Sequence, residues 1–280
     1  MKVGNKYLAW VWDTFDLPIR FLYAHSGGAL NKLLFWNLYT SDFEKLDTVF
    51  QNIIEVFDKG EITFKDKVVL ELGPGNSYIN AFNALMCGAK KVYLVDKFPR
   101  VIETKGQQEY FKKELDFISR KYNRPLFFIK NGKVDPQYIE SVPKDLTETD
   151  IINVDIVISK SVFEHIKDVE GNVKKLSEIL VPDGVMYHFI DLRDHYNFNN
   201  PFLFYKYGDR VWNKYLTKEG HTYTNRLRYD DFCRLFEKHE FEMIAEEVQR
   251  FDLPINIRNQ FVGQKEDLKV GIMQVVLCKK

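Results

Sequence analysis

The stretch 68–77 constrains the fold of this chain more than any other part of the sequence. An apolar run leads into Glu71, and two glycines, Gly73 and Gly75, follow with one residue between them. A helical pattern of apolar residues then covers 78–86. This order predicts a strand, a tight turn and a helix. Glycines accept backbone angles that other residues resist, and they let a ligand approach the main chain closely.

A second apolar run, Val92 to Val95, ends in Asp96. Asp96 follows the glycines by about twenty residues, the spacing at which an acidic residue meets a ribose in nucleotide-binding folds. A carboxylate there suits the two hydroxyls of an adenosine ribose. The two strand ends are therefore predicted to converge on one nucleoside-like ligand.

Tyr78 separates two families that share this pattern. A dinucleotide-binding fingerprint needs a third glycine at that position, so Tyr78 favours a smaller adenosyl ligand. With Glu71-Leu72-Gly73-Pro74-Gly75 as a first motif and Val95-Asp96 as a second, the sequence resembles the class I S-adenosylmethionine-dependent methyltransferases. The structural alternative is a ligand-free α/β domain with a Gly-Pro-Gly turn.

This resemblance implies an α/β fold with a doubly wound, mostly parallel seven-stranded sheet and an antiparallel edge strand. N-terminal helices and an insertion after the fifth strand would be additions to it. The expected division is an N-terminal helical cover at 1–66 and a cofactor-binding domain at 67–280, with an acceptor-side insertion at 191–228.

The amino-acid composition indicates which classes of binding partner and which cellular compartment to expect. Forty basic residues balance forty acidic ones, so the formal net charge is zero. This balance does not indicate a nucleic-acid or anionic-membrane partner. The three cysteines, Cys87, Cys233 and Cys278, lie far apart, which fits a reducing compartment. No apolar run approaches a membrane span. A soluble, cytoplasmic protein is expected, and the sequence does not indicate an oligomeric state.

Apolar periodicity predicts the remaining elements. Helices are expected at 43–57, 104–121, 169–180 and 230–238. Strands are expected at 126–129, 154–159, 185–190, 241–248 and 271–277. A polar connection is expected at 133–153 and a Pro/Gly turn at 181–184.

The resemblance also implies which residues hold S-adenosylmethionine. Asn131 stands where the family often carries an aspartate that meets the adenine amino group. The full set of expected cofactor-binding residues is Glu71, Gly73, Pro74, Gly75, Asp96, Lys97, Asn131 and Ser159.

Methyl transfer from a sulfonium requires mainly alignment and exclusion of water, because the cofactor carries the activation. A hydroxyl acceptor also needs a base for its proton. His165 follows the fourth strand, and Asp191 and His195 follow the fifth, so these three are the catalytic candidates. A packing role is the alternative for His165. His188 lies within a strand and is expected to be buried.

The residues that follow the fourth and fifth strands bear on whether the chain binds a metal ion and where it binds the acceptor. A catechol-type metal site would need carboxylates after the fourth and fifth strands; Asp191 offers one, but Ser159-Lys160 offers none, so no metal is expected. The expected substrate-binding residues are Arg193, Tyr196, Arg226 and Arg228. Alternatively, the arginines are solvated and the aromatic residues of 191–228 form a satellite core.

Together these features predict an S-adenosylmethionine-dependent methyltransferase that acts on a small polar molecule, at oxygen rather than nitrogen. Asp191 and His195, the aromatic insertion and Asn225-Arg226-Leu227-Arg228 resemble bacterial methyltransferases associated with cell-surface glycan synthesis. That resemblance implies a sugar or nucleotide-linked acceptor. The alternatives are a nicotinamide-dependent oxidoreductase and a non-catalytic methyltransferase-like interaction protein.

Overall fold

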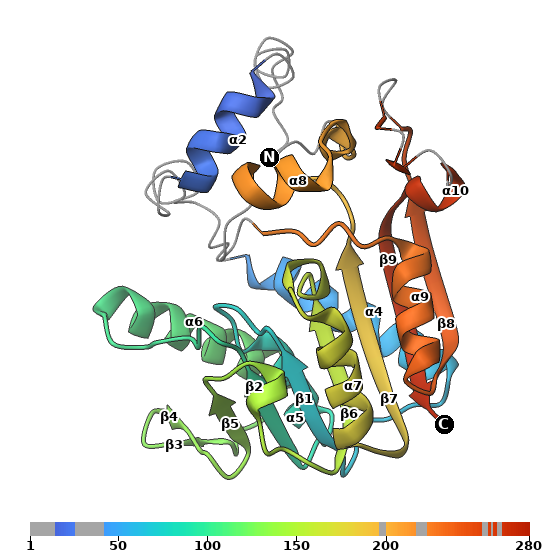
Figure 1. Ribbon diagram of the computed structural model, residues 1–280. Coiled ribbons are helices and arrows are strands. Elements are labelled where there is room, and N and C mark those ends of the chain that lie inside the picture. Colours follow the sequence, from blue (N-terminus) through green and yellow to red (C-terminus); the bar gives the residue numbers. More distant parts are fainter. Residues whose placement is uncertain are drawn as a thin grey trace.

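The apolar runs of the sequence become the central strands of a seven-stranded sheet (Figure 1). The computed structural model describes residues 15–25, 42–195, 200–216, 223–253, 257–258, 260–261 and 265–280. The strand order is β5-β2-β1-β6-β7-β9-β8. The strands are β1 (Val68–Leu72), β2 (Lys91–Val95), β5 (Ile139–Val142), β6 (Val154–Lys160), β7 (Leu180–Asp191), β8 (Phe241–Arg250) and β9 (Val270–Lys279).

Strand direction follows the expected pattern. β5, β2, β1, β6 and β7 are parallel, and β9 runs antiparallel to both β7 and β8. The predicted mostly parallel sheet with an antiparallel pair at one edge is confirmed. Parallel strands place their carboxyl ends at a common edge, which is where ligands bind in such sheets.

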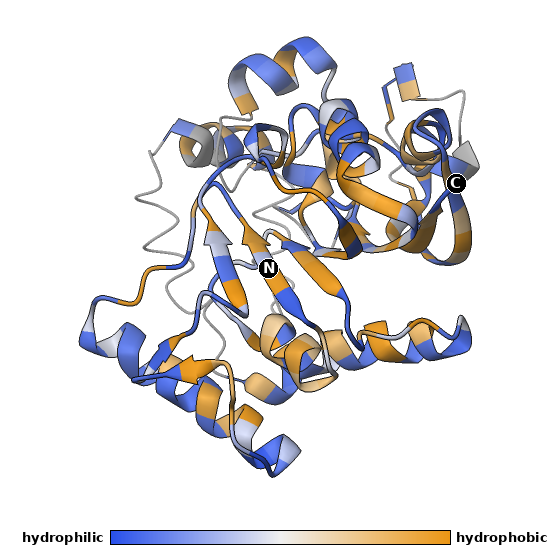
Figure 2. Ribbon diagram, turned by 90° about the horizontal axis from the view of Figure 1, so that it is seen from below, coloured by the Kyte–Doolittle hydropathy of each residue, from blue (hydrophilic) through white to orange (hydrophobic). Residues whose placement is uncertain are grey.

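Helices cover both faces of the sheet, with α7 in front and α4 behind in Figure 1. Alternate β1 residues face opposite sides: Val69 packs with one helix layer, and Leu70 packs with the other. The first layer is α4 (Phe43–Lys59), α5 (Ile79–Met86) and α6 (Lys105–Tyr122), and the second is α7 (Val169–Ile179) and α9 (Tyr229–Lys238). Figure 2 shows the central strands coloured largely as hydrophobic, as burial on both faces requires.

Local signals place the helix ends. Asp42 caps α4 by accepting a hydrogen bond from the Lys45 amide. Thr104 and Gln107 form a reciprocal capping box at the start of α6. These side chains satisfy amides that have no partner inside the helix. All five predicted helices, at 43–57, 78–86, 104–121, 169–180 and 230–238, form within a few residues of their expected bounds.

The predicted strand at 126–129 is wrong. Phe128 is fully buried, but only Ile129–Lys130 (β3) is extended, and it pairs with β4 (Lys133–Val134) in a separate hairpin. The third parallel strand is β5, which pairs with β2 inside the predicted polar connection. β5 lies at the sheet edge and is largely exposed, so it needs few apolar residues, whereas Phe128 owes its burial to packing against a helix.

The predicted Pro/Gly turn at 181–184 lies within β7. The strand first pairs at Leu180 with Val154, and the pairing resumes at Val185 with Ile156 after an irregularity. Asp183 takes a positive φ of 60° there. The regular part of the strand begins at Val185, as the sequence predicted.

The insertion after β7 forms its own small core. Its described elements are η3 (Leu203–Lys206), α8 (Asp209–Val211) and the π-helical turn η4 (Trp212–Leu216). The buried residues of this core are Phe202, Phe204, Tyr205, Trp212, Leu216 and, from α10 (Lys265–Leu268), Leu268. The satellite core weighed as an alternative therefore accounts for these aromatic rings.

Helix α2 (Asp16–His25) lies against this insertion, above the end of β7 in Figure 1. Arg20 is completely buried and donates to both carboxylate oxygens of Asp194, with Nη1 at 3.0 Å from Oδ1. Its Nε donates to Asp16 at 2.7 Å, and the Tyr207 hydroxyl donates to the same carboxylate at 2.7 Å. Helix α2 and the insertion after β7, which are far apart in sequence, meet in this buried network.

Within the part of the chain that the structure describes, no helix combines the length and hydrophobicity needed to cross a membrane.

Candidate functional site

The glycine turn after β1 opens onto free space at the carboxyl edge of the sheet. Gly73 and Gly75 have φ of +68° and +63°, values that side chains with a β-carbon rarely adopt. A β-carbon at Gly73 would lie 2.5 Å from a methyl group of Val162, so this glycine is required by packing. A β-carbon at Gly75 would meet no described atom within 4 Å, so the described residues leave the main chain there open to a ligand.

Glu71 lies beneath this turn and is nearly buried. Its Oε1 accepts a hydrogen bond from Asn80 at 2.8 Å, and its Oε2 has no hydrogen-bond partner among the described residues. Burial raises the pKa of Glu71 to about 7, and the Asn80 hydrogen bond lowers it in part. A polar or cationic group of a ligand could therefore contact Oε2 and change the pKa of this carboxyl.

The ends of β2 and β5 bring further charged residues to the same edge. Asp96 follows β2 directly, and its Oδ1 accepts a hydrogen bond from the Phe98 amide at 2.7 Å. The exposed Lys97 forms an ion pair at 3.3 Å with Asp145, which follows β5. Sequence reasoning missed Asp145 because β5 was not recognised as a strand.

Asn131 does not lie at this edge. It occupies the turn of the β3–β4 hairpin, where it is exposed with a φ of +53°. It precedes β5, whereas ligand contacts in such sheets follow the strands. The interpretation of Asn131 as an adenine contact depended on a parallel strand at 126–129. Because that strand does not form, the position of Asn131 does not support this contact.

Ser159, at the end of β6, is buried against His188 of the neighbouring strand. The hydroxyl lies 2.7 Å from Nδ1 of His188. Burial lowers the pKa of His188 to about 3, so this imidazole is neutral. His188 is completely buried, in agreement with its expected packing role.

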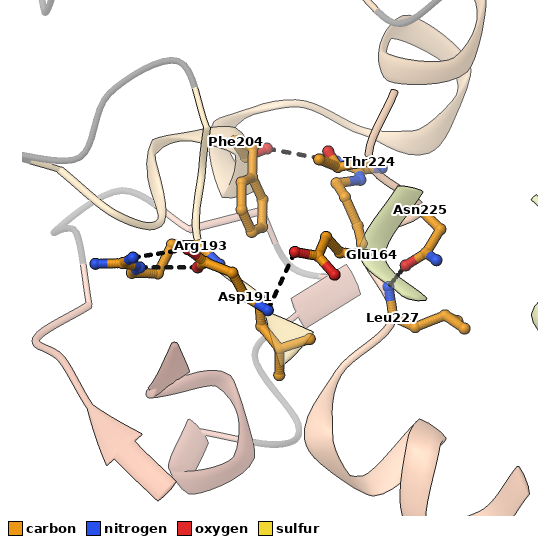
Figure 3. Close-up of a pocket in the computed structure, with 9 residues that line it drawn as sticks. Glu164, Asp191, Arg193, Phe204, Thr224, Asn225 and Leu227 are labelled. Carbon is orange, nitrogen blue, oxygen red and sulfur yellow. Dashed lines mark hydrogen bonds and ion pairs between the residues drawn. The ribbon is translucent and has the colours of Figure 1, made fainter. Parts of the chain in front are cut away.

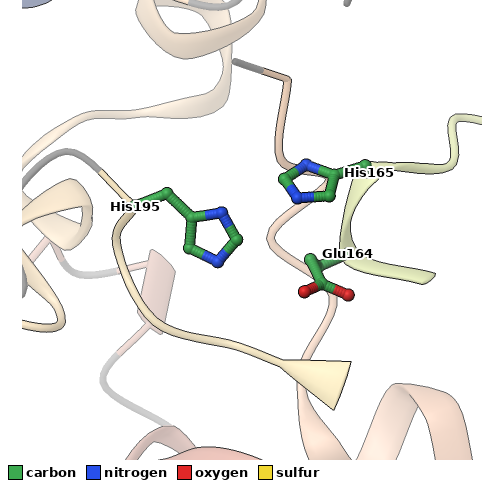
Figure 4. A group of neighbouring side chains, drawn as sticks. All are labelled: Glu164, His165 and His195. Atoms are coloured by element: carbon green, nitrogen blue, oxygen red, sulfur yellow. The ribbon is translucent and has the colours of Figure 1, made fainter. Parts of the chain in front are cut away.

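Glu164, His165 and His195 come together beyond β6 and β7 (Figure 4). One ligand atom of each lies within 4.8 Å of the others. Nδ1 of His165 lies 2.6 Å from the Tyr223 carbonyl and donates to it, which leaves Nε2 as an acceptor. Burial lowers the pKa of His195, an effect that Asp191 offsets only in part. The sequence singled out both histidines but not Glu164.

Glu164 is the most buried member of this group. Its Oε1 accepts the Asp191 amide at 3.3 Å, and Oε2 has no hydrogen-bond partner among the described residues. Burial raises the pKa of Glu164 well above its ordinary value of 4.5.

Asp191, a candidate base, is held by Arg193 in a two-point ion pair, with Nε–Oδ1 at 2.8 Å and Nη2–Oδ2 at 2.6 Å. Its Oδ2 also lies 3.9 Å from Nε2 of His195. Asp191 and Arg193 therefore pair with each other, and the distance from Asp191 to Nε2 of His195 is too long for a hydrogen bond.

Arg226 and Arg228 are structural in their described contacts. Arg228 is buried and donates to the carbonyls of Leu192, Leu268 and Val270, so it has no exposed group for an anion. Arg226 pairs with Asp209 and donates to the carbonyls of Phe204 and Tyr207. The expected anion-binding roles are not supported by this arrangement. Tyr196 lies outside the described residues.

A small pocket lies between the end of β7 and the segment before α9 (Figure 3). Its empty volume is about 210 Å³. The lining residues are Glu164, Asp191, Leu192, Arg193, Phe204, Thr224, Asn225, Arg226 and Leu227. Charged, polar and apolar side chains line this pocket, which suits contact with part of a small molecule.

The carboxyl edge fits the expected adenosyl cofactor. The space above Gly75 leaves room beside the main chain, and Asp96 supplies a carboxylate at the end of the next strand. Glu71 adds a carboxyl oxygen with no hydrogen-bond partner among the described residues.

Comparison with known proteins identified similar solved structures. Similar solved structures include an S-adenosylmethionine-dependent methyltransferase described as putative from Listeria monocytogenes, with 15% identity over 78% of this chain and 92% of that one and a TM-score of 0.43. Another is magnesium protoporphyrin IX methyltransferase from Synechocystis, solved with bound S-adenosylhomocysteine, with 10% identity over 96% and 99% of the two chains and a TM-score of 0.48.

A search of curated protein sequences found no match. The family model described as "Methyltransferase domain" matches residues 44–246, which span β1 to β7 and most of β8. This match covers well over half of the chain, and it includes the glycine turn, Asp96 and the Glu164–His165 segment. The chain therefore belongs to the methyltransferase-domain family and is an S-adenosylmethionine-dependent methyltransferase.

Proposed function

We propose that this enzyme transfers the methyl group of S-adenosylmethionine to a hydroxyl oxygen of a small polar molecule, and that the acceptor is a sugar or a nucleotide-linked compound. S-adenosylmethionine supplies the activated methyl group. The chain then has to align the acceptor, exclude water and take up the proton of the hydroxyl.

The observation that carries the proposal is the cluster of Glu164, His165 and His195. Its two imidazoles include one whose Nε2 is an acceptor and one whose pKa is lowered by burial. Neutral imidazoles accept protons near neutral pH. Such a cluster at the strand ends favours a hydroxyl, which must lose a proton, over an amine that is already neutral.

The acceptor class is supported by the pocket beside this cluster. Glu164, Thr224 and Asn225 border it with hydrogen-bonding groups, which suits contact with part of a polar acceptor. Most of the described aromatic rings of the insertion pack in their own core, and Phe204 of that core also lines the pocket. The resemblance in sequence to enzymes of glycan synthesis supports a sugar or nucleotide-linked acceptor.

An acceptor screen with methyl-labelled cofactor tests the proposal. Label should enter an oxygen of a sugar or nucleotide-linked molecule, and His165→Ala and His195→Ala should each lower kcat by about 100-fold or more, the usual range for a lost general base. Affinity for S-adenosylhomocysteine should be unchanged in both variants. Label on nitrogen, or near-normal turnover in both variants, would overturn it.

A matched control is His239→Ala. His239 lies at the end of α9, where its Nε2 is 3.6 Å from the exposed Glu170. It is remote in structure from the strand ends that hold the cluster, so its replacement should leave turnover unchanged.

A further inference from the structure

The same three side chains also have the composition of a metal centre. Glu164 and His165 come from the short turn η2 (Phe163–His165) after β6, and His195 comes from the segment after β7 (Figure 4). Among the described residues they form a group whose ligand atoms lie within 4.8 Å of one another. We propose that Glu164, His165 and His195 bind a divalent transition-metal ion.

The orientation of His165 supports this site. Metal-bound histidines almost always donate their second ring N–H to a carbonyl or a carboxylate, which fixes the tautomer and the ring orientation. Nδ1 of His165 makes such a bond to the Tyr223 carbonyl at 2.6 Å. Its Nε2 lone pair is therefore the atom presented to the cluster. The two imidazole rings meet edge to face, with their centroids 4.9 Å apart.

Glu164 supplies the second, independent observation. Its side chain is about 2% exposed, and its Oε2 has no hydrogen-bond partner among the described residues. A buried carboxylate oxygen without a partner is costly, and a cation beside it removes that cost. The other oxygen is already held by the Asp191 amide, so the carboxylate is fixed while Oε2 remains available.

The donor set selects the kind of ion. Two imidazoles and one carboxylate suit zinc, iron, cobalt or nickel, whereas magnesium and calcium prefer oxygen ligands. Bonds of about 2.0–2.2 Å hold neighbouring donor atoms roughly 3 Å apart, so the present group must contract slightly. Three protein ligands leave positions open for a substrate oxygen.

This set differs from the catechol-type site that the sequence excluded. That site needs carboxylates after the fourth and fifth strands, whereas here two of the three ligands are histidines, and Asp191 is paired with Arg193. The expectation that the chain holds no metal considered only the carboxylates.

The role of the ion rests on the proposed function. Each imidazole lone pair can bind either a proton or the metal ion. The metal-free enzyme would therefore use an imidazole as the base for the acceptor, whereas the metal-loaded enzyme would not. An ion that binds the hydroxyl oxygen lowers its pKa, as metal ions do for bound water. Metal binding itself does not depend on the acceptor, so it can be measured without it.

Untagged protein, stripped with chelator, should be titrated with Co²⁺ in a calorimeter while its visible absorption is recorded. The expected result is one Co²⁺ per chain with absorption bands from imidazole ligation. Glu164→Gln keeps the side-chain shape and the hydrogen bond from Asp191, and it should weaken Co²⁺ binding by about tenfold or more. His165→Ala with His195→Ala should abolish it.

His239→Ala serves as the control for adventitious His–Glu binding and should retain full affinity. Unchanged melting temperature and S-adenosylhomocysteine affinity would show that the variants are folded. Absence of Co²⁺ and Zn²⁺ binding, or equal binding by the double-histidine variant, would overturn the metal site. A loaded protein that methylates no hydroxyl would instead uphold the site and overturn the proposed function.

Discussion

Glu71 shows how one side chain at the cofactor edge links ligand binding to stability. Its carboxyl is buried under the glycine turn with a single hydrogen bond from Asn80. Because burial disfavours the charged form, the folded protein holds a proton there up to about pH 7, whereas an exposed carboxyl of this kind has a pKa of 4.5.

We predict that the contribution of Glu71 to stability falls as the pH rises from 4.5 to 7, because at this residue the folded state binds more protons than the unfolded state in that window. The shift corresponds to at most about 3 kcal/mol. Glu71→Gln should remove this dependence, so it should be more stable than the parent at pH 8 and similar at pH 4. Denaturant unfolding of both proteins at the two pH values measures the difference. The opposite contribution of His188 cancels in this comparison. A constant difference between the proteins would contradict the prediction.

Substitution of the two motif glycines is predicted to have different effects: at Gly73 mainly on stability, and at Gly75 mainly on cofactor binding. Gly73→Ala should destabilise the fold by the backbone strain plus a clash with Val162, together about 2–4 kcal/mol. Adding Val162→Ala should relieve the clash but not the strain. Gly75→Val faces open space, so it should incur only the strain, about 1–2 kcal/mol, and abolish S-adenosylhomocysteine binding. Calorimetric titration and thermal melts separate the two. Retained affinity in Gly75→Val would remove this turn from the cofactor site.

At the scale of elements, the segment after β7 is fixed by Arg228, just before α9. The buried guanidinium connects the carbonyl of Leu192 to those of Leu268 and Val270 near the start of β9. One side chain thus joins the ends of three elements close to the cluster of Glu164, His165 and His195.

We predict that Arg228→Met lowers the free energy of unfolding by about 3–5 kcal/mol, because several buried carbonyls lose their donor at once. Arg234→Met on the same helix is the matched control. Arg234 is largely exposed and pairs with Asp231, so its loss should change stability by less than about 1 kcal/mol. Urea unfolding of both variants tests this. Equal effects would mean that the buried contacts contribute little.

Sequence patterns predicted the elements whose burial is continuous. β1, β2, β6 and the regular part of β7 were recognisable because both their faces are covered. β5 was missed because an exposed edge strand carries little apolar pattern, and Asp145 was missed with it. The pairing of Arg228 with distant carbonyls could not be predicted, since a sequence does not distinguish a buried arginine from a solvated one. The domain boundaries remain predictions.

At the scale of the whole molecule, the ion pairs of Arg20 with Asp16 and Asp194 hold α2 against the insertion. Arg20→Met would leave two buried carboxylates without their cation. We predict that amide exchange in α2 and η3 then speeds up, while exchange in the central strands stays slow, because local opening relieves the charges at less cost than global unfolding. Hydrogen exchange followed by mass spectrometry measures this. The control is Lys174→Met, which removes an exposed pair with Glu178. Unchanged protection of α2 would contradict the prediction.

The separation of Arg20 from Asp194 also affects how the chain is made. The two residues are 174 positions apart, and at roughly 5–20 residues per second a ribosome needs about 9–35 seconds to cover that distance. Helix α2 is thus synthesised early but reaches its position only after the strands up to β7 have emerged. Until then Arg20 stays hydrated. We predict that this contact also forms late when the full-length chain refolds, because it closes a long loop, so replacing Arg20 should speed unfolding and leave the refolding rate nearly unchanged.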